Sequence, residues 1–221
     1  MKRKAALVLL LLMLSGQIGA ADVIRSWRGN KKTVALTFDD GPHPQYTQEI
    51  LDILGEYGVH ATFFVIGENA ERHPELVEAE EAAGHEIGNH TYSHRDLCKL
   101  TDEEIRSEID GAERILYEDQ EIRTRLLRPP GGNVGPGVCR IAAERDYTVV
   151  CWSVDTRDWA HTPTDKIVQN VLSSVKEGDI ILFHDYVVGD SPTPAALRLI
   201  IPKLLDEGYR FVTVSELLYG S

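Results

Sequence analysis

The sequence predicts an α/β fold, a distorted barrel of about seven parallel strands, and two observations support this prediction. First, apolar runs rich in β-branched and aromatic residues alternate with amphipathic helical stretches, the order typical of a parallel sheet. Second, polar residues that are costly to bury follow one run after another, as they do in parallel barrels with active sites at the carboxyl ends of the strands. The runs span residues 33–38, 61–67, 85–90, 124–130, 147–155, 179–185 and 210–217.

The stretches between these runs carry helical signals. Residues 46–58 ("YTQEILDILGEYG") and 101–119 ("TDEEIRSEIDGAERILYED") repeat apolar residues at helical spacing. The second stretch opens with Thr101 and Glu104, which have the spacing of a capping box. The chain has no internal repeat, linker or low-complexity tract. We therefore expect a single domain over residues 22–221.

The first residues predict a signal peptide over residues 1–21. Three basic residues precede an apolar segment from Ala5 to Leu14, and small residues follow near Ala20 and Ala21. The apolar segment is shorter than the roughly 20 residues that a bilayer span needs. We therefore expect export and cleavage, which give a secreted, extracellular or cell-wall-associated protein without a membrane span. An uncleaved anchor is the alternative.

The charge of the chain excludes one class of partner. The formal net charge is -12, whereas nucleic acids and anionic lipids are bound through basic patches. A neutral or partly cationic ligand fits better. The three cysteines lack C-x-x-C spacing and allow at most one internal disulfide, and Cys151 lies within an apolar run.

Adjacent carboxylates follow the first run, in "TFDDGP", and two histidines follow the third, in "HTYSH". On one helical turn His90 and His94 would face the same side. Two imidazoles and one carboxylate, from Asp39 or Asp40, form the ligand set of a hydrolytic zinc site, and the other carboxylate could act as a general base. Arg128 is available to neutralise that base. The alternatives are surface histidines and a surface arginine.

A candidate general acid follows the sixth run. His184 comes after a fully apolar strand, and an aspartate partner would poise it for proton transfer, with Asp155 and Asp158 both candidates. A buried structural histidine is the alternative. Trp159 is either a core residue or an apolar wall on which a sugar ring packs. The glycine-rich loop at residues 131–137 lacks a phosphate-binding G-K-[ST], but its N–H groups could donate to an oxyanion.

Taken together, five motifs resemble the polysaccharide deacetylases of carbohydrate esterase family 4, also called the NodB-homology domain. They are "TFDDGP", "HTYSH", "RPPGG", "DTRDW" and "ILFHD", in the family order over residues 34–218. The resemblance implies a barrel of the NodB-homology type. It also implies that Asp39 is the catalytic base and that Asp40, His90 and His94 hold the metal.

The remaining motifs imply further roles. Arg128 would order the base, and Asp158 rather than Asp155 would orient the acid His184. Leu182 would line the pocket for the acetyl methyl group, and Trp159 would line the groove.

The third motif departs from the family pattern. The family places an aromatic residue, usually tyrosine, after the proline, and its backbone N–H binds the oxyanion, whereas this sequence has Gly131. The backbone donor survives this change and the aromatic wall does not. The departure therefore bears on groove shape and substrate preference rather than on the chemistry.

The resemblance implies a metal-dependent N-deacetylase. Such an enzyme hydrolyses the N-acetyl amide of N-acetylglucosamine residues and releases acetate, and we expect peptidoglycan to be the polymer. Zinc suits the ligands, although cobalt or nickel could occupy them, and we expect a monomer. The alternatives are a chitin or chitooligosaccharide deacetylase, an O-acetyl esterase of the acetylxylan type, and an inactive carbohydrate-binding module. The inactive module would lack a base, ligand or acid, and here every such position is filled.

Overall fold

The structure is a computed structural model that describes residues 20–29 and 32–220. The predicted signal peptide lies outside the described residues, apart from Ala20 and Ala21. The Ala21 N–H donates to the Cys139 carbonyl at 2.9 Å. Among the described helices, none has the length and apolar character needed to cross a membrane.

The described residues form nine strands in one curved sheet, in which every pairing is parallel. The order across the sheet is β1-β6-β5-β4-β3-β2-β8-β7, and β9 pairs with the start of β2. The predicted distorted (β/α) barrel is confirmed. The strands are β1 (Val23–Ile24), β2 (Thr33–Asp39), β3 (Thr62–Val65), β4 (Glu86–Asn89), β5 (Leu126–Leu127), β6 (Thr148–Val150), β7 (Val154–Asp155), β8 (Ile180–His184) and β9 (Arg210–Phe211).

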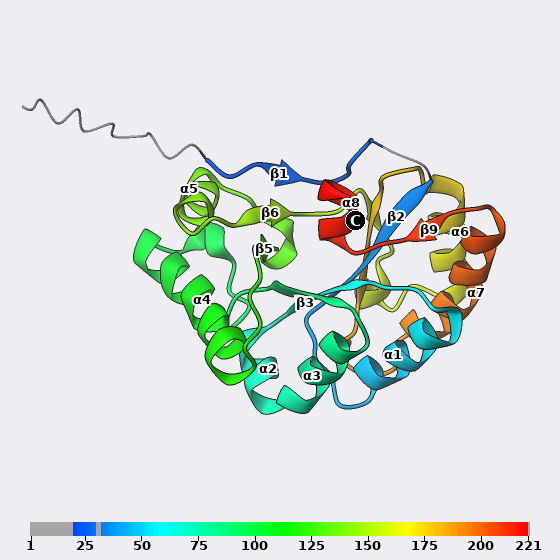
Figure 1. The fold of residues 1–221 in the computed structure, drawn as a ribbon, viewed down its shortest axis with the longest axis horizontal. Helices are drawn as coiled ribbons and strands as arrows, with labels where there is room; N and C mark the ends of the chain where they lie inside the picture. The colour runs from blue at the N-terminus through cyan, green and yellow to red at the C-terminus, as the bar shows by residue number, and fades with distance from the viewer. Residues whose placement is uncertain (1–19, 30–31, 221) are drawn as a thin grey trace, which may run out of the picture.

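The helices alternate with the strands along most of the chain, and most of them lie around the outside of the sheet (Figure 1). Residues 46–58 and 101–119 are largely helical, as predicted, and the capping box of Thr101 and Glu104 is present. A π-helical turn, Ile115–Asp119, continues α4. The α-helices are α1 (Tyr46–Tyr57), α2 (Gly67–Arg72), α3 (Pro74–Ala82), α4 (Asp102–Arg114), α5 (Pro136–Glu144), α6 (Thr164–Ser174), α7 (Thr193–Asp206) and α8 (Val214–Tyr219).

Strand β2 is buried along its whole length because it lies between β3 and β8 and is covered on both faces. Its side chains alternate between the two faces of the sheet. Phe38 belongs to the outer core under the helices, where its ring stacks on Phe63 and Phe183. Ala35 belongs to the inner cluster with α8. Thr37 and Asp39 share this inner face, and Asp39 ends the strand at the carboxyl edge of the sheet.

The predicted fifth run, residues 147–155, is interrupted. It forms β6 and β7, which lie near opposite ends of the sheet order and are separated by residues 151–153. At the break, the Val150 and Cys151 carbonyls accept hydrogen bonds from a side chain, the Arg128 guanidinium, both at 3.2 Å. Residues 151–153 therefore connect β6, near one end of the sheet order, to β7 at the other end.

The predicted strand at residues 210–217 is wrong beyond Phe211. Helix α8 follows instead, and it begins with a capping box in which Thr213 Oγ1 accepts from the Glu216 N–H and the Glu216 carboxylate accepts from the Thr213 N–H. The alternating "VTV" is typical of a strand. The T-x-x-E spacing that follows is the signal that predicts the helix.

Glu80 is an unusual part of the core. It lies on α3, its side chain is fully buried, and neither carboxyl oxygen has a hydrogen-bond partner among the residues described. Burial, with a smaller contribution from the charge of Asp185, raises the pKa of Glu80 well above its usual value. The folded protein therefore keeps a proton that the unfolded chain releases above pH ~4.5.

We expect Glu80→Gln to stabilise the protein increasingly as pH rises from 5 to 8. A raised folded-state pKa makes the wild-type protein lose stability with rising pH, and glutamine removes this loss. Urea unfolding at both pH values measures the difference in the free energy of unfolding between variant and wild type, which should be larger at pH 8 than at pH 5. Glu78→Gln, an exposed change on the same helix, is the control. A difference between wild type and Glu80→Gln that does not change with pH would contradict the prediction.

Candidate active site

Most of the predicted site residues line one cavity at the carboxyl ends of the strands, and the other two, Arg128 and Asp158, contact Asp39 and His184 from behind its lining. The cavity has a volume of about 390 Å³ and is lined by Asp39, Asp40, His90, His94, Gly131, Trp152, Asp155, Trp159, Leu182 and His184. Asp39 and His184 are register partners on β2 and β8. The parallel ladder therefore fixes the candidate base and the candidate acid side by side.

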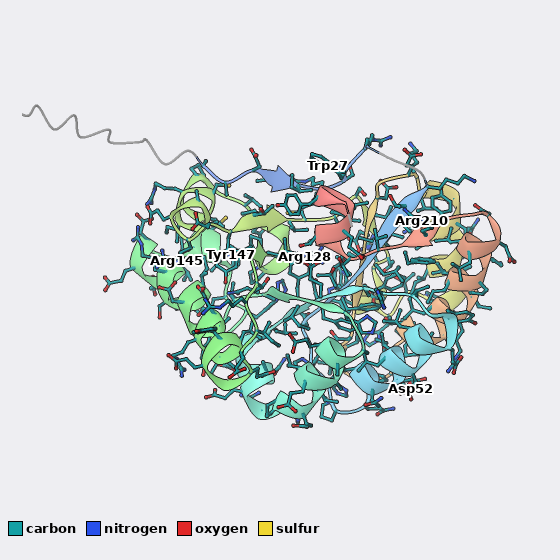
Figure 2. The ribbon with its side chains drawn as sticks, viewed as in Figure 1. Trp27, Asp52, Arg128, Arg145, Tyr147 and Arg210 are labelled. Atoms are coloured by element: carbon teal, nitrogen blue, oxygen red, sulfur yellow. The ribbon has the colours of Figure 1, made fainter. Side chains whose placement is uncertain are left out.

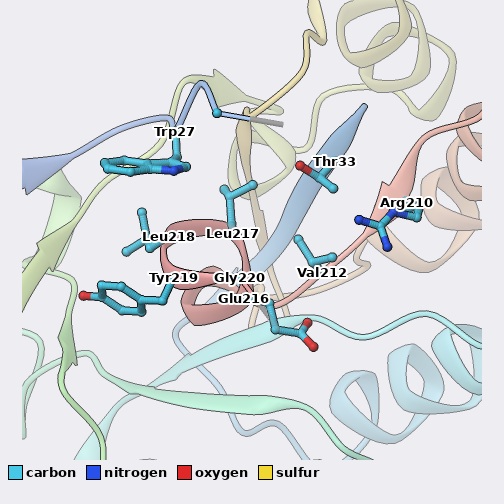
Figure 3. Close-up of a pocket in the computed structure, with 10 residues that line it drawn as sticks. Trp27, Thr33, Arg210, Val212, Glu216, Leu217, Leu218, Tyr219 and Gly220 are labelled. Carbon is cyan, nitrogen blue, oxygen red and sulfur yellow. The ribbon is translucent and has the colours of Figure 1, made fainter. Parts of the chain in front are cut away.

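A larger hollow, about 480 Å³, lies near the start of β2. Trp27, Arg210, Glu216 and Tyr219 are among its lining residues (Figure 3). It contains none of the predicted site residues. Size therefore does not identify the site, whereas convergent titratable groups do.

Arg128 neutralises the first of the two adjacent aspartates. Its Nη1 donates to Asp39 Oδ1 at 2.6 Å and to Thr37 Oγ1 at 2.9 Å. The guanidinium is fully buried, and its Cζ lies 4.0 Å from the centre of the Phe64 ring. Figure 2 shows Arg128 in the middle of the molecule, whereas Arg145 lies near its edge. Arg128 is therefore not a surface arginine.

The second aspartate faces the two histidines. Asp40 Oδ1 lies 3.3 Å from His90 Nε2 and 3.1 Å from His94 Nε2. The His90 Nδ1–H donates to the Arg128 carbonyl at 2.7 Å, which leaves Nε2 free to coordinate. Burial raises the pKa of Asp40, but the two imidazoles outweigh it and hold the pKa well below its usual range.

The histidines are not held by a helical turn, contrary to the prediction from their spacing. Residues 90–96 have no helical assignment, and Thr91 and His94 have positive φ values of 70° and 58°. The loop is held instead by Glu108 of α4, which accepts from the Ser93 N–H at 2.8 Å and from the Ser93 hydroxyl at 2.6 Å. Sequence reasoning missed Glu108 because nothing in α4 indicates which loop it supports.

Asp158, and not Asp155, contacts the candidate acid. The His184 Nδ1–H donates to Asp158 Oδ1 at 2.7 Å, and the His184 backbone N–H donates to Oδ2 at 2.7 Å. Thr193, which sequence reasoning missed, also donates to Oδ2 at 2.6 Å. Burial lowers the pKa of His184, but the Asp158 carboxylate outweighs it, so that the pKa rises to about 9. Asp155 instead accepts from the Arg157 N–H at 2.8 Å.

The groove residues complete the cavity. Gly131 has a φ of 64°, and its N–H has no hydrogen-bond partner in the described part of the chain. Leu182 is buried, and Trp159 is 51% exposed at the rim. Trp152 also lines the cavity, and sequence reasoning missed it because its run reads as continuous core.

The three cysteines are free thiols.

Comparisons with known proteins agree on one family. The family model for polysaccharide deacetylase matches residues 27–150. A peptidoglycan-N-acetylglucosamine deacetylase of Bacillus cereus is 46% identical over 192 residues, which cover 86% of this chain and 89% of the relative. A chitooligosaccharide deacetylase of Sinorhizobium fredii is 41% identical over 188 residues, which cover 80% of this chain and 87% of the relative.

Solved structures have the same fold. The Bc1960 peptidoglycan N-acetylglucosamine deacetylase superimposes with a TM-score of 0.87 at 41% identity, and the match covers 90% of this chain and 94% of that one. A family 4 pseudoenzyme of Bacillus anthracis superimposes with a TM-score of 0.85 at 31% identity, and the match covers 91% of this chain and 70% of that one. The fold is therefore shared by active and inactive proteins, and the argument for activity depends on the residues of the site.

Proposed function

Because this chain belongs to the polysaccharide deacetylase family, we propose that its cavity removes the acetyl group from N-acetylglucosamine residues of peptidoglycan and releases acetate. The enzyme is a hydrolase of carbon–nitrogen bonds other than peptide bonds. The observation that carries the proposal is a pair of buried ion pairs in the site. Arg128 pairs with Asp39, and Asp158 pairs with His184. Both pairs accompany the candidate metal ligands Asp40, His90 and His94.

The residues of this set fit a divalent ion. The candidate ligand atoms of Asp40, His90 and His94 lie within 4.8 Å of one another. Asp40 Oδ1 is buried and makes no hydrogen bond with a described residue, although both Nε2 atoms lie close to it. Atoms that converge without bonding to one another are suited to ligating a shared cation. Zinc suits two imidazoles and a carboxylate, and cobalt or nickel could replace it. When bound, the ion would polarise the amide carbonyl and make water more acidic.

Asp39 is the proposed general base. Arg128 occupies its Oδ1, which places a buried positive charge beside the carboxylate and fixes its orientation. Oδ2 lies 3.7 Å from His90 Nε2 and so faces the ligand set. This free oxygen can take the proton of the attacking water.

His184 is the proposed general acid. With a pKa of about 9, the imidazole carries a proton at neutral pH. The Asp158 carboxylate holds the Nδ1–H, so Nε2 is the atom that can deliver a proton to the departing sugar nitrogen. An amine anion is a very poor leaving group, and this protonation allows the carbon–nitrogen bond to break.

The groove residues position the acetamido group. The unpartnered N–H of Gly131 is a donor for the oxyanion that forms on the carbonyl. Buried Leu182 offers an apolar contact to the acetyl methyl group, and exposed Trp159 offers a ring to the sugar. The proposal takes the chain to act as a monomer.

Peptidoglycan is the proposed substrate, and chitooligosaccharides are the alternative. Relatives with both names match most of this chain, and both substrates present the same acetamido sugar. The net charge of -12 disfavours a nucleic acid. Action on the cell wall implies an extracellular or wall-associated location, which the apolar leader also predicts.

Acetate release by the purified chain tests the proposal. The substrates are peptidoglycan, N-acetylglucosamine oligomers and acetylated xylan, each with chelator and with chelator followed by zinc. We expect release from the amino sugars that chelator abolishes and zinc restores. Release only from xylan would identify an esterase. No release from any substrate by folded, metal-loaded protein would overturn the proposal.

A further inference from the structure

Trp152 lies in the break between β6 and β7, where the chain crosses from one end of the sheet order to the other. Its ring is half-buried against the inner core cluster, and it also lines the active-site cavity. The Arg128 Cζ lies 5.7 Å from the ring centre. The ring is therefore held by the same guanidinium that orients the proposed base.

The glycines after Arg128 leave room for this ring. A Cβ on Gly132 would lie 2.7 Å from Trp152 Cη2 and 3.0 Å from Cζ3, so a side chain there would collide with the indole. Gly131 and Gly132 have φ values of 64° and 65°, which other residues rarely adopt. The position without an aromatic side chain, Gly131, is therefore adjacent to the position against which the Trp152 ring packs, Gly132.

Two polar groups on residues that line this cavity have no hydrogen-bond partner in the described part of the chain. The Trp152 indole N–H has no hydrogen-bond partner among residues 20–29 and 32–220, and it is not a sealed core atom. Three residues further on, Asp155 also lines the cavity, and only its Oδ1 is engaged, by the Arg157 N–H. An apolar ring bordered by a free donor and a free acceptor suits a sugar, which has an apolar face and a rim of hydroxyl groups.

We propose that Trp152 forms the aromatic wall of the subsite that binds the acetamido sugar, with Asp155 accepting a hydrogen bond from one of its hydroxyl groups. The inference rests on the proposed function and names a specificity-determining residue for it. Trp152 replaces the wall that a side chain at position 131 would supply, but from another strand end. It is a positioning residue and takes no part in proton transfer.

Kinetics on N-acetylglucosamine oligomers test the inference. We expect Trp152→Leu to raise KM by about tenfold with a much smaller change in kcat, because stacking is lost while the catalytic groups remain. Trp152→Phe should recover most of the KM. Trp27→Leu is the matched control, since Trp27 is 45% exposed and lines the other hollow (Figure 3). A raised KM in the control alone would move the sugar site to that hollow and overturn the proposal.

Binding without turnover separates this inference from the proposed reaction. Trp27, Trp152 and Trp159 are the three tryptophans of the chain, so in Trp27→Phe the emission comes from Trp152 and Trp159, and the part of a shift that is lost on adding Trp152→Phe belongs to Trp152. Titration with N-acetylglucosamine oligomers under chelator should shift its emission. A shift without acetate release by wild type would retain the subsite and reject the deacetylase. Acetate release with no shift, and with an unchanged KM in folded Trp152→Leu, would reject the subsite alone.

Discussion

Asp39→Asn is expected to lower kcat by about 100-fold or more on N-acetylglucosamine oligomers. The amide oxygen of asparagine can still accept from the Arg128 guanidinium, which now donates to Asp39 Oδ1 at 2.6 Å, so the fold should persist. The amide group cannot take a proton from water. The measurement is steady-state turnover alongside zinc content per chain.

Asp40→Asn is the matched variant on the neighbouring residue. It should lose activity together with zinc, because Asp40 belongs to the proposed ligand set. Asp39→Asn should keep its zinc. Near-wild-type turnover in Asp39→Asn with full zinc content would refute the assignment of Asp39 as base, and loss of zinc from Asp39→Asn would place both aspartates among the ligands.

Arg128→Met is expected to destabilise the protein by about 3–5 kcal/mol, the usual cost of removing one partner from a buried ion pair. The Asp39 side chain is only 4% exposed and would be left charged without its cation. The Val150 and Cys151 carbonyls would also lose a donor. Urea unfolding measures the change in the free energy of unfolding.

Arg140→Met is the control, because Arg140 forms a pair with Asp102 at 2.6 Å in which both side chains are about half exposed. Such pairs contribute about 0–1 kcal/mol. Adding Asp39→Asn to Arg128→Met should restore part of the lost stability, since no charge is then left unpaired. Strictly additive losses would show that the buried pair is not the source of the effect.

Much of the site follows from the sequence because the sheet is parallel. Polar residues at successive strand ends must share one edge, so Asp39, His90 and His184 could be placed together before any coordinates. Strand β2 was also predictable, since a run buried on both faces is mostly apolar and rich in β-branched residues. These inferences need only a periodic pattern and one rule of topology.

Other features depend on contacts between distant residues and leave no local signal. The run at residues 147–155 breaks where Arg128, which follows β5, donates hydrogen bonds to two of its carbonyls. The spacing of His90 and His94 predicts a helical turn, but Glu108 holds the loop in another conformation. The helix after Phe211 is different, because its capping box was visible in the sequence.

The register of β2 with β8 has a consequence for the growing chain. Asp39 is made before its register partner His184, and β2 also pairs with β9, which is made later still. Contacts between residues so far apart in the sequence form only after the intervening chain exists, and they slow folding. A growing chain that has not yet reached β8 therefore holds half of the proposed proton-transfer pair and has no means of acting on an acetylated sugar until β8 has been made and has paired with β2.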